Sequence, residues 1–487
     1  MVEYMGEMSE SRIAAEASEA ASSAAAAAAA AGVHAANVAA GETGAVPPRA
    51  AGAVYMGGYC APALERVRVA VIGLGENRGR PQARLLAEIP HCEVVAVCDV
   101  YADATLETAR YVEEKTGRRP AEYCGSPGAY LRMLQEVRPD AVLISTPWET
   151  HAQVAIEAME HGAHAFVEVP LALTLQDLWR VVDAAERTQR HCMMMENVNY
   201  GREELMFLHM VRRGLIGELL HAEAAYMHDL RMQMGSVGRG CGSWRTFHYA
   251  ERDGNLYPTH GLGPVAQYMS LARGEDMFDR IVSFGSPALG RAAYARKHFP
   301  PQHQWNRLDY KCADVSSSII KTKAGRTILL QWDETTPAPY DRRNAIRGTE
   351  GALAGFPLRV AGERLSPPLS PEQVAETGQH DAWRVWRQGP EAEQELFALY
   401  DHPLYRRLGG VAREIGGRKA LDYIMLCRAV ECLHRGEPLD QNVYEGALWS
   451  AVGPLSEKSV HEGGAPQAFP DFTRGGWRAT APLGIVP

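Results

Sequence analysis

The sequence lacks the features that mark several large classes of protein. Of its 487 residues 46% are hydrophobic, yet no apolar run approaches the roughly 18 residues of a membrane-spanning helix. Lys and Arg number 50 against 59 Asp and Glu, and no basic cluster suits nucleic acid. The nine cysteines are odd in number and include no CxxC pair, so neither a disulfide framework nor a zinc site is predicted. We expect a globular chain of two or three domains without a nucleic-acid, membrane or metal partner.

Residues 1–63 differ in composition from the rest of the chain. Alanine runs unbroken from Ala24 to Ala31, so the segment is interpreted as an alanine helix or a disordered arm. Its start carries Glu3, Glu7 and Glu10 where an export signal has basic residues, and no twin arginine precedes the alanines. We therefore expect a low-complexity arm on a cytoplasmic protein, with export left open.

The most informative stretch begins at Val67. A β-branched apolar run ends at Gly73 and Gly75, and a helical pattern follows over 82–89. This order predicts the first strand, phosphate loop and helix of a dinucleotide-binding unit, because glycines let the backbone approach a pyrophosphate and the helix N-terminus attracts its charge. The third glycine, Gly79, is displaced by one position, which gives GxGxxxG.

A second strand over 93–98 ends at Asp99, 24 residues after Gly75. An acid at that distance binds the ribose hydroxyls and would repel the 2′-phosphate of NADP. Asp99 therefore predicts NAD as the cofactor.

Strands and helices alternate up to residue 200. The expected helices cover 102–115, 127–136, 151–161 and 174–189. The expected strands lie near 121 and over 141–145, 164–167 and 191–200, the last ending in amides and a tyrosine. This alternation predicts a doubly wound parallel sheet, a Rossmann domain over 64–200. Ligands of that fold lie beyond the carboxyl ends of the strands, so the residues that follow each strand are the main candidates for ligand binding and catalysis.

The second half of the chain predicts an α+β domain with a mainly antiparallel open sheet, over 201–487. Strand-like runs cover 221–228, 279–286, 314–321, 326–333 and 344–353, and the turn at 323–325 predicts a hairpin. Two late helices, 419–435 and 443–460, are expected to pack back on the core or on a partner subunit, so a homo-oligomer is left open.

Several motifs follow the predicted strands. They are TPWETH (146–151), Glu168-Val169-Pro170 and ENVNYGREEL (196–205). The first two resemble the glucose-fructose oxidoreductase, inositol dehydrogenase and MocA superfamily, whose dehydrogenases usually have Glu-Lys-Pro with the Lys as acid/base. Here Val169 takes the Lys position and cannot move a proton.

Together with AYMHDLR (225–231), NLYPTHGLGP (255–264) and FPDFTRGGW (469–477), these motifs resemble the NAD-dependent α-N-acetylgalactosaminidases of glycoside hydrolase family 109 over 67–477. The resemblance implies that NAD is held, beside Gly73 and Gly75, by Asn77, Arg78, Asp99, Trp148, Glu149, Thr150, His151, Glu168, Val169 and Asn197. It implies that the sugar is held by Tyr226, Arg245, Tyr257, Pro258, Thr259, His260 and Tyr340.

The chain departs from the family pattern in three respects. The third glycine is displaced, no export signal is found, and residues 417–422 read Gly-Arg-Lys-Ala-Leu-Asp where family members often read Gly-His-Gly-Gly-Met-Asp. The last difference bears on substrate identity if that segment borders the sugar.

The resemblance also implies a redox-assisted mechanism in which NAD stays tightly bound and is recycled. Hydride leaves sugar C3, the C2 proton is lost, the glycosidic oxygen departs, water adds, and the hydride returns. Tyr257 is interpreted as the base, because the helix start at 261–264 should favour its phenolate, and His260 as proton donor or partner. Competing interpretations are a buried structural Tyr257 with a capping His260, an ordinary sugar or cyclitol dehydrogenase, and a non-catalytic NAD-binding sensor.

Overall fold

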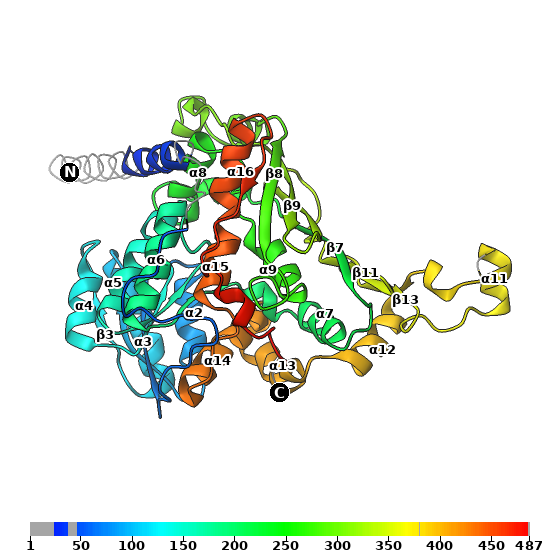
Figure 1. The fold of residues 1–487 in the computed structure, drawn as a ribbon. Coiled ribbons are helices and arrows are strands. Elements are labelled where there is room, and N and C mark those ends of the chain that lie inside the picture. The colour runs from blue at the N-terminus through cyan, green and yellow to red at the C-terminus, as the bar shows by residue number, and fades with distance from the viewer. Residues whose placement is uncertain (1–23, 38–45, 379, 486–487) are drawn as a thin grey trace.

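The computed structural model describes residues 24–37, 46–378 and 380–485 (Figure 1). Residues 67–194 build a six-stranded parallel sheet with strand order β3-β2-β1-β4-β5-β6. Its strands are β1 (Val67–Ile72), β2 (Cys92–Cys98), β3 (Ala121–Tyr123), β4 (Ala141–Ile144), β5 (His164–Val167) and β6 (Cys192–Met194). The predicted doubly wound Rossmann sheet is confirmed.

Helices cover this sheet because its central strands are buried on both faces. β4 and β5 are buried along their whole length, as strands between two helical layers must be. The helices are α2 (Gly79–Leu86), α3 (Ala102–Thr116), α4 (Ala129–Val137), α5 (His151–Glu160) and α6 (Leu175–Thr188). β1 pairs with β2 on one side and with β4 on the other, so the strand order reverses at β1, where this fold binds ligands.

The second sheet has nine strands in the order β14-β13-β12-β11-β7-β10-β9-β8-β15. They are β7 (Leu219–Met227), β8 (Phe278–Gly285), β9 (Val315–Thr322), β10 (Thr327–Asp333), β11 (Ala345–Gly348), β12 (Gly351–Ala354), β13 (Arg359–Gly362), β14 (Arg387–Gln388) and β15 (Gln467–Ala468). The mainly antiparallel sheet is confirmed, and β9 and β10 form the predicted hairpin. β7 and β10 pair in parallel, so the chain leaves both at the same edge.

The predicted strand over 344–353 is wrong in one respect, because it is a hairpin of β11 and β12. Thr349 and Glu350 form the turn and donate their N–H groups to the carbonyls of Glu218 and Ile216, just before β7. Gly348 allows that approach, since a Cβ there would lie 2.1 Å from the Ile216 oxygen.

Further helices follow β6 along the chain (Figure 1). They are α7 (Arg202–Arg212), α8 (Cys241–Glu251), α9 (Thr259–Tyr268), α10 (Gly290–His298), α11 (Pro371–Thr377), α12 (Pro390–Tyr400), α13 (Pro403–Gly416), α14 (Ala420–Arg435), α15 (Val443–Ser450) and α16 (Val452–His461). α14 packs on α2 and β1, α15 packs on α6 and β6, and α16 packs on β8. The expected single helix over 443–460 is thus two helices that meet at Ala451, and the late helices span both domains. α11 lies at the end of a projection beyond β13 (Figure 1).

The described part of the N-terminal arm is helical over residues 24–37. His34 and Asn37 contact the buried carboxylate of Glu457 on α16, at 2.8 Å each, and the side chain of Ala30 is fully buried. The acidic start at Glu3, Glu7 and Glu10 lies outside the described residues.

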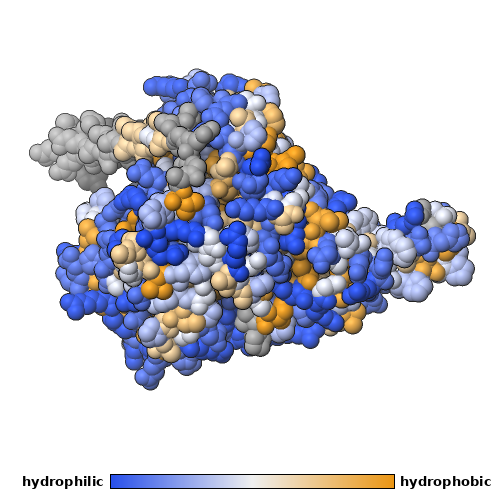
Figure 2. Space-filling model, in the orientation of Figure 1, coloured by the Kyte–Doolittle hydropathy of each residue, from blue (hydrophilic) through white to orange (hydrophobic). Residues whose placement is uncertain are grey.

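The molecular surface is mixed in polarity. Figure 2 shows hydrophilic residues across the viewed face, with hydrophobic residues in small groups between them. Within residues 24–37, 46–378 and 380–485, no helix combines the length and the apolar character required to cross a membrane.

Candidate active site

The phosphate loop between β1 and α2 has the backbone that its glycines predict. Gly73 has φ +84°, and a Cβ there would lie 2.6 Å from the carbonyl oxygen of Ser145. A Cβ at Gly79 would lie 1.8 Å from the Gly73 oxygen, so the displaced third glycine is the one that lets α2 pack on the loop. A Cβ at Gly75 would meet nothing within 4 Å. The loop is therefore open at Gly75, as a pyrophosphate group requires.

Asp99 lies beside this loop, directly after β2. Its carboxylate accepts the N–H of Leu74 at 2.6 Å and that of Tyr101 at 3.0 Å. Asp99 thus lies at the edge of the sheet that its spacing from Gly75 predicts, while its contact with a ribose stays a prediction.

Arg78 is the centre of an ion-pair network that joins both domains. Its guanidinium lies 2.5 Å from Glu168, which follows β5, and 3.2 Å from Asp422 on α14. Gln82 also donates to Glu168, at 2.5 Å, and Asn197 donates to Asp422, at 2.7 Å. Burial lowers the pKa of Arg78, but Glu168 and Asp422 outweigh it and the pKa is raised. Arg78 therefore stays charged beside the phosphate loop.

The segment 417–422, where the chain departs from the family pattern, borders this loop. The Lys419 ammonium donates to the carbonyl oxygen of Asn77 at 2.6 Å, and Asp422 pairs with Arg78. Burial lowers the pKa of Lys419. The difference from the family pattern therefore bears on the cofactor loop.

The polar atoms that remain unpaired here fit a bound NAD. Among the described residues, Oδ1 of Asn197 and Nε of Arg78 are buried without a hydrogen-bond partner. A nucleotide offers hydroxyl and amide donors to the first and phosphate oxygens to the second. Together with the open face at Gly75, they form a donor and acceptor set that suits the cofactor.

Residues 146–151 form the loop after β4 and the start of α5. Both ring nitrogens of His151 contact main-chain oxygens, Nδ1 that of Pro170 at 2.7 Å and Nε2 that of Thr146 at 2.9 Å, and burial lowers its pKa. Glu149 contacts His248 of α8 at 2.8 Å, and Thr150 donates to the hydroxyl of Thr146. His151 thus connects the loop after β4 with the loop after β5. Glu149 connects the loop after β4 with α8 of the second domain.

Trp148 and Val169, both predicted to contact the cofactor, are buried apolar residues. Their exposed fractions are 2% and 3%. The ring of Trp148 lies 5.8 Å from that of Tyr257, so the predicted cofactor and sugar residues adjoin.

The structure brings together four of the predicted sugar residues. The ring of Tyr226, at the end of β7, lies 5.3 Å from Tyr257, 4.9 Å from His260 and 6.0 Å from Tyr340. Tyr257 precedes α9 and His260 stands in its first turn. Tyr340 is 39% exposed, whereas Tyr226 and Tyr257 are buried. The four rings thus run from the interior of the site to its mouth.

Pro258 and Thr259 lie between Tyr257 and His260 at the start of α9. Pro258 is the N-terminal cap position, and Thr259 is buried with a hydroxyl that makes no hydrogen bond of regular geometry among the described residues.

Arg245 on α8 lies behind this cluster. Its guanidinium carbon is 4.6 Å from the Trp148 ring and 5.0 Å from the Tyr257 ring. Its Nη1 donates to Gln233 at 3.5 Å, and no described carboxylate forms an ion pair with it. Arg245 therefore presents its charge to the aromatic residues.

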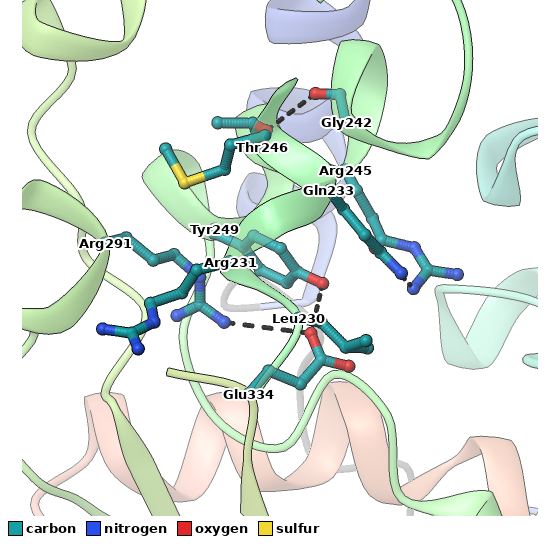
Figure 3. A pocket seen from close by; sticks show the side chains of 10 residues that line it. Leu230, Arg231, Gln233, Gly242, Arg245, Thr246, Tyr249, Arg291 and Glu334 are labelled. Carbon is teal, nitrogen blue, oxygen red and sulfur yellow. Dashed lines mark hydrogen bonds and ion pairs between the residues drawn. The ribbon is translucent and has the colours of Figure 1, made fainter. Parts of the chain in front are cut away.

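A small cavity, with room for about one water molecule, lies beside Arg245, which is one of its lining residues (Figure 3). Its lining includes Glu334, which accepts from Tyr249 at 2.5 Å and lies 3.9 Å from Arg291. Leu230 and Met234 supply apolar walls. The cavity is too small to hold a sugar.

The expected phenolate of Tyr257 is wrong. Burial raises the pKa of Tyr257, and the opposing effects of Arg245 and Arg78 are smaller. The sequence placed Tyr257 correctly near a helix N-terminus but gave no sign of how deeply the hydroxyl is buried. Burial therefore favours the protonated phenol of Tyr257 over the phenolate, which bears on its assignment as base.

Sequence reasoning missed three residues of the site. Glu196 contacts His260 at 2.7 Å, His228 contacts the hydroxyl of Tyr226 at 3.0 Å, and Asp422 joins the Arg78 network. Glu196 follows β6, so the rule that ligands gather at the strand ends of a parallel sheet could have found it. Asp422 ends the segment 417–422 that the family pattern singled out, but no local pattern gives its contact with Arg78, because it lies on a distant helix.

Comparison with known proteins identifies both halves of the chain. Residues 67–196 match the family described as an oxidoreductase family with an NAD-binding Rossmann fold, and residues 200–479 match the C-terminal domain of glycosyl hydrolase 109. Solved structures show the same fold at low identity. An oxidoreductase from Agrobacterium radiobacter in complex with NAD+, L-tartaric acid and magnesium has a TM-score of 0.55 at 15% identity, covering 82% of this chain and 98% of that one. Levoglucosan dehydrogenase in complex with NADH and levoglucosan has a TM-score of 0.54 at 15% identity, with 83% and 100% covered.

Two curated relatives are much more similar. Glycosyl hydrolase family 109 protein 1 of Akkermansia muciniphila is 57% identical over 440 residues, which cover 90% of this chain and 89% of that protein. The alpha-N-acetylgalactosaminidase of Shewanella oneidensis is 48% identical over 456 residues, which cover 93% and 96%. The chain therefore belongs to glycosyl hydrolase family 109 and carries the NAD-binding Rossmann domain of the oxidoreductase family at its N-terminal side.

Proposed function

We propose that the protein hydrolyses α-linked N-acetylgalactosamine from glycosides by elimination and water addition, with an NAD that stays bound between turnovers. The observation that carries the proposal is the contact of Trp148 with Tyr257, which makes the sugar cluster adjoin the cofactor loop. The 48% identity to the alpha-N-acetylgalactosaminidase of Shewanella oneidensis supports the choice of sugar.

Arg78, Asp99 and Asn197 are the residues that would hold NAD. When bound, NAD would supply reversible oxidation of the sugar C3 hydroxyl, which acidifies the proton on C2. Arg78 would meet the pyrophosphate, Asp99 the ribose and Asn197 an amide or hydroxyl donor. Val169 and Trp148 keep water away from that end of the site, since both are buried.

His260 and Tyr257 would move the two protons of the elimination. His260 takes the C2 proton on Nε2, the electron pair forms the C1–C2 double bond, and the C1–O bond breaks. The departing oxygen takes its proton from the hydroxyl of Tyr257, whose pKa burial raises. Water then adds its hydroxyl to C1 and its proton to Tyr257, while His260 returns a proton to C2. This assignment reverses the one that the sequence suggested, because a phenol that burial keeps protonated can donate its proton but cannot accept the C2 proton.

Arg245 and Tyr340 would orient the sugar. Arg245 lies over Tyr257 without a carboxylate partner among the described residues, so its N–H groups are available to sugar oxygens. Tyr340 stands at the exposed end of the cluster, where the rest of the glycoside would leave the site.

The test is a screen of nitrophenyl glycosides of both anomers with the purified protein and no added cofactor. The proposal predicts release of nitrophenol from the α-N-acetylgalactosaminide with no net formation of NADH. Steady NADH formation in proportion to sugar turnover would instead identify a dehydrogenase. Bound NAD without turnover of any glycoside would favour the non-catalytic sensor.

A further inference from the structure

Glu196 and His260 meet across the boundary between the two domains. Glu196 follows β6 at the edge of the Rossmann sheet, and His260 stands in the first turn of α9. Oε1 of Glu196 lies 2.7 Å from Nδ1 of His260. The Glu196 side chain is fully buried, and the His260 side chain is 12% exposed. A carboxylate of one domain thus holds the imidazole of the other.

The contact determines which ring nitrogen carries the proton. A carboxylate only accepts hydrogen bonds, so Nδ1 of His260 must donate, and Nε2 of the neutral ring is left without a proton. Burial raises the pKa of Glu196, but the neighbouring His260 and the Thr259 hydroxyl outweigh it and the pKa is lowered. Glu196 therefore remains an acceptor, and Nε2 is the nitrogen open to a substrate.

Little else competes for this carboxylate. Oε1 also accepts the N–H of Val198 at 3.1 Å, and Oε2 has no partner of regular hydrogen-bond geometry among the described residues. The main-chain oxygen of Glu196 accepts from Gln441 at 3.1 Å, which holds the loop in place. The negative charge of Glu196 is therefore directed at His260.

Helix α9 leaves space for Glu196 because residue 263 is a glycine. Gly263 lies one turn after His260 on the same face of the helix. A Cβ there would lie 2.9 Å from Cγ of Glu196 and 2.9 Å from Oδ1 of Asn199. Any larger residue at this position would push the carboxylate away from the imidazole.

The other titratable groups that face His260 are Tyr226 at the end of β7, His228 directly after β7, and Tyr257 from the loop before α9. Tyr226 is engaged with His228 at 3.0 Å, and burial raises the pKa of both tyrosines. Neither tyrosine offers a negative charge. Glu196 is therefore the group that can stabilise a positive imidazole here.

We propose that Glu196 is the positioning residue of the site: it fixes His260 with its proton on Nδ1 and stabilises the imidazolium that forms when Nε2 takes the C2 proton. This inference rests on the proposed function, which assigns that proton transfer to His260. Glu196 itself touches neither sugar nor cofactor in this account.

The direct test is nitrogen NMR of the full-length holoenzyme labelled with 15N-histidine. The His260 signals are assigned by their loss in His260→Asn. The expected result is the tautomer with hydrogen on Nδ1, and a shift towards the Nε2–H tautomer in Glu196→Ala. Glu186→Gln, which alters another fully buried carboxylate that pairs with Arg474, should leave the signals unchanged. An Nε2–H tautomer of His260 in the wild-type protein would overturn the inference.

A kinetic series separates positioning from a merely structural role. Glu196→Gln keeps an acceptor but loses the charge, so kcat should fall by about 10²-fold, the low end of general-base effects, with KM little changed. The acid limb of the pH–rate profile should move to lower pH, because the imidazolium loses its counter-charge. Glu196→Asp should recover part of kcat and restore the limb. A fall in kcat without movement of the limb would overturn the inference.

Gly263→Ala provides a second route if the Glu196 variants do not fold. Its added Cβ should displace the carboxylate and change the His260 tautomer while every titratable side chain remains. An unchanged tautomer in a folded Gly263→Ala would also overturn the inference. A wild-type protein that cleaves no glycoside would refute the proposed function alone, since the tautomer is measured without turnover.

Discussion

Around the phosphate loop, charged side chains are paired with one another, whereas around Tyr257 the side chains meet through the faces of their rings. At the cofactor end, Arg78 is held between Glu168 and Asp422, which come from different domains. At the sugar end, Arg245 lies over aromatic rings and has no carboxylate partner among the described residues. The first arrangement would suit the proposed NAD that stays bound through many turnovers, and the second would suit the proposed sugar, which must leave after each one.

The largest expected effect is at the sugar end. His260→Ala removes the proposed base, so glycoside cleavage and hydrogen exchange at C2 should fall by about 10²–10⁴-fold. Bound NAD should be unchanged, because the Arg78 network does not include His260. Cleavage is measured with nitrophenyl glycosides and NAD content after denaturation. His228→Ala, which alters the histidine on the other side of Tyr226, is the matched control and should cost much less.

A second substitution at the sugar end, Tyr257→Phe, tests the residue proposed as the acid. It removes the proposed acid, so poor leaving groups should depart more slowly while nitrophenol, which needs little protonation, is less affected. Exchange at C2 should persist. Loss of exchange in Tyr257→Phe together with its retention in His260→Ala would return the base to Tyr257.

The next effect is expected at the cofactor end. Asp99→Ala removes the carboxylate predicted to bind the ribose, so the protein should be isolated without NAD although its fold remains. The measurement is NAD content together with the melting temperature. A folded Asp99→Ala that retains a full complement of NAD would show that the ribose is held elsewhere.

A smaller effect is expected at Lys419, where the family pattern often has glycine. Its ammonium contacts the main chain of Asn77, and it adds a positive charge close to the site proposed for the pyrophosphate. Lys419→Gly should release NAD several-fold faster on dilution, with the initial rate of sugar cleavage by loaded protein unchanged. Lys311→Ala, which loses a surface pair with Glu251, is the control. Equal release rates in all three proteins would exclude Lys419 from cofactor retention.

The smallest effect is expected for the N-terminal arm. Deletion of residues 1–45 removes the contacts of His34 and Asn37 with Glu457, which remains paired with Arg252. Each lost hydrogen bond costs about 1 kcal/mol of stability, so the melting temperature should fall by a few degrees while kcat is unchanged. A folded truncation with much lower kcat would mean that the arm helps to form the site.

The two ends of the site also differ in how far the sequence could predict them. Asp99, Glu168 and Asn197 follow strands of a regular alternation, so their common edge could be inferred from the order of strands and helices alone. Tyr257 and His260 belong to a recognisable motif, but the protonation of Tyr257 depends on burial by distant residues. Asp422 reaches Arg78 only because α14 packs on α2, and the hairpin at 349–350 depends on a carbonyl of the segment before β7. Burial by distant residues and contacts between distant segments cannot be inferred from local sequence patterns.

The proposed elimination requires that the C2 proton of the sugar be removed in a step of its own. The measurement is turnover of an α-N-acetylgalactosaminide in D₂O, with hydrogen isotopes at C2 of the product read by NMR, beside the rate with substrate deuterated at C2. We expect deuterium at C2 of the product formed in D₂O, and a primary isotope effect on the rate with C2-deuterated substrate. Product formed in D₂O from unlabelled substrate that carries no deuterium at C2, together with an unchanged rate for the C2-deuterated substrate, would contradict the proposed elimination.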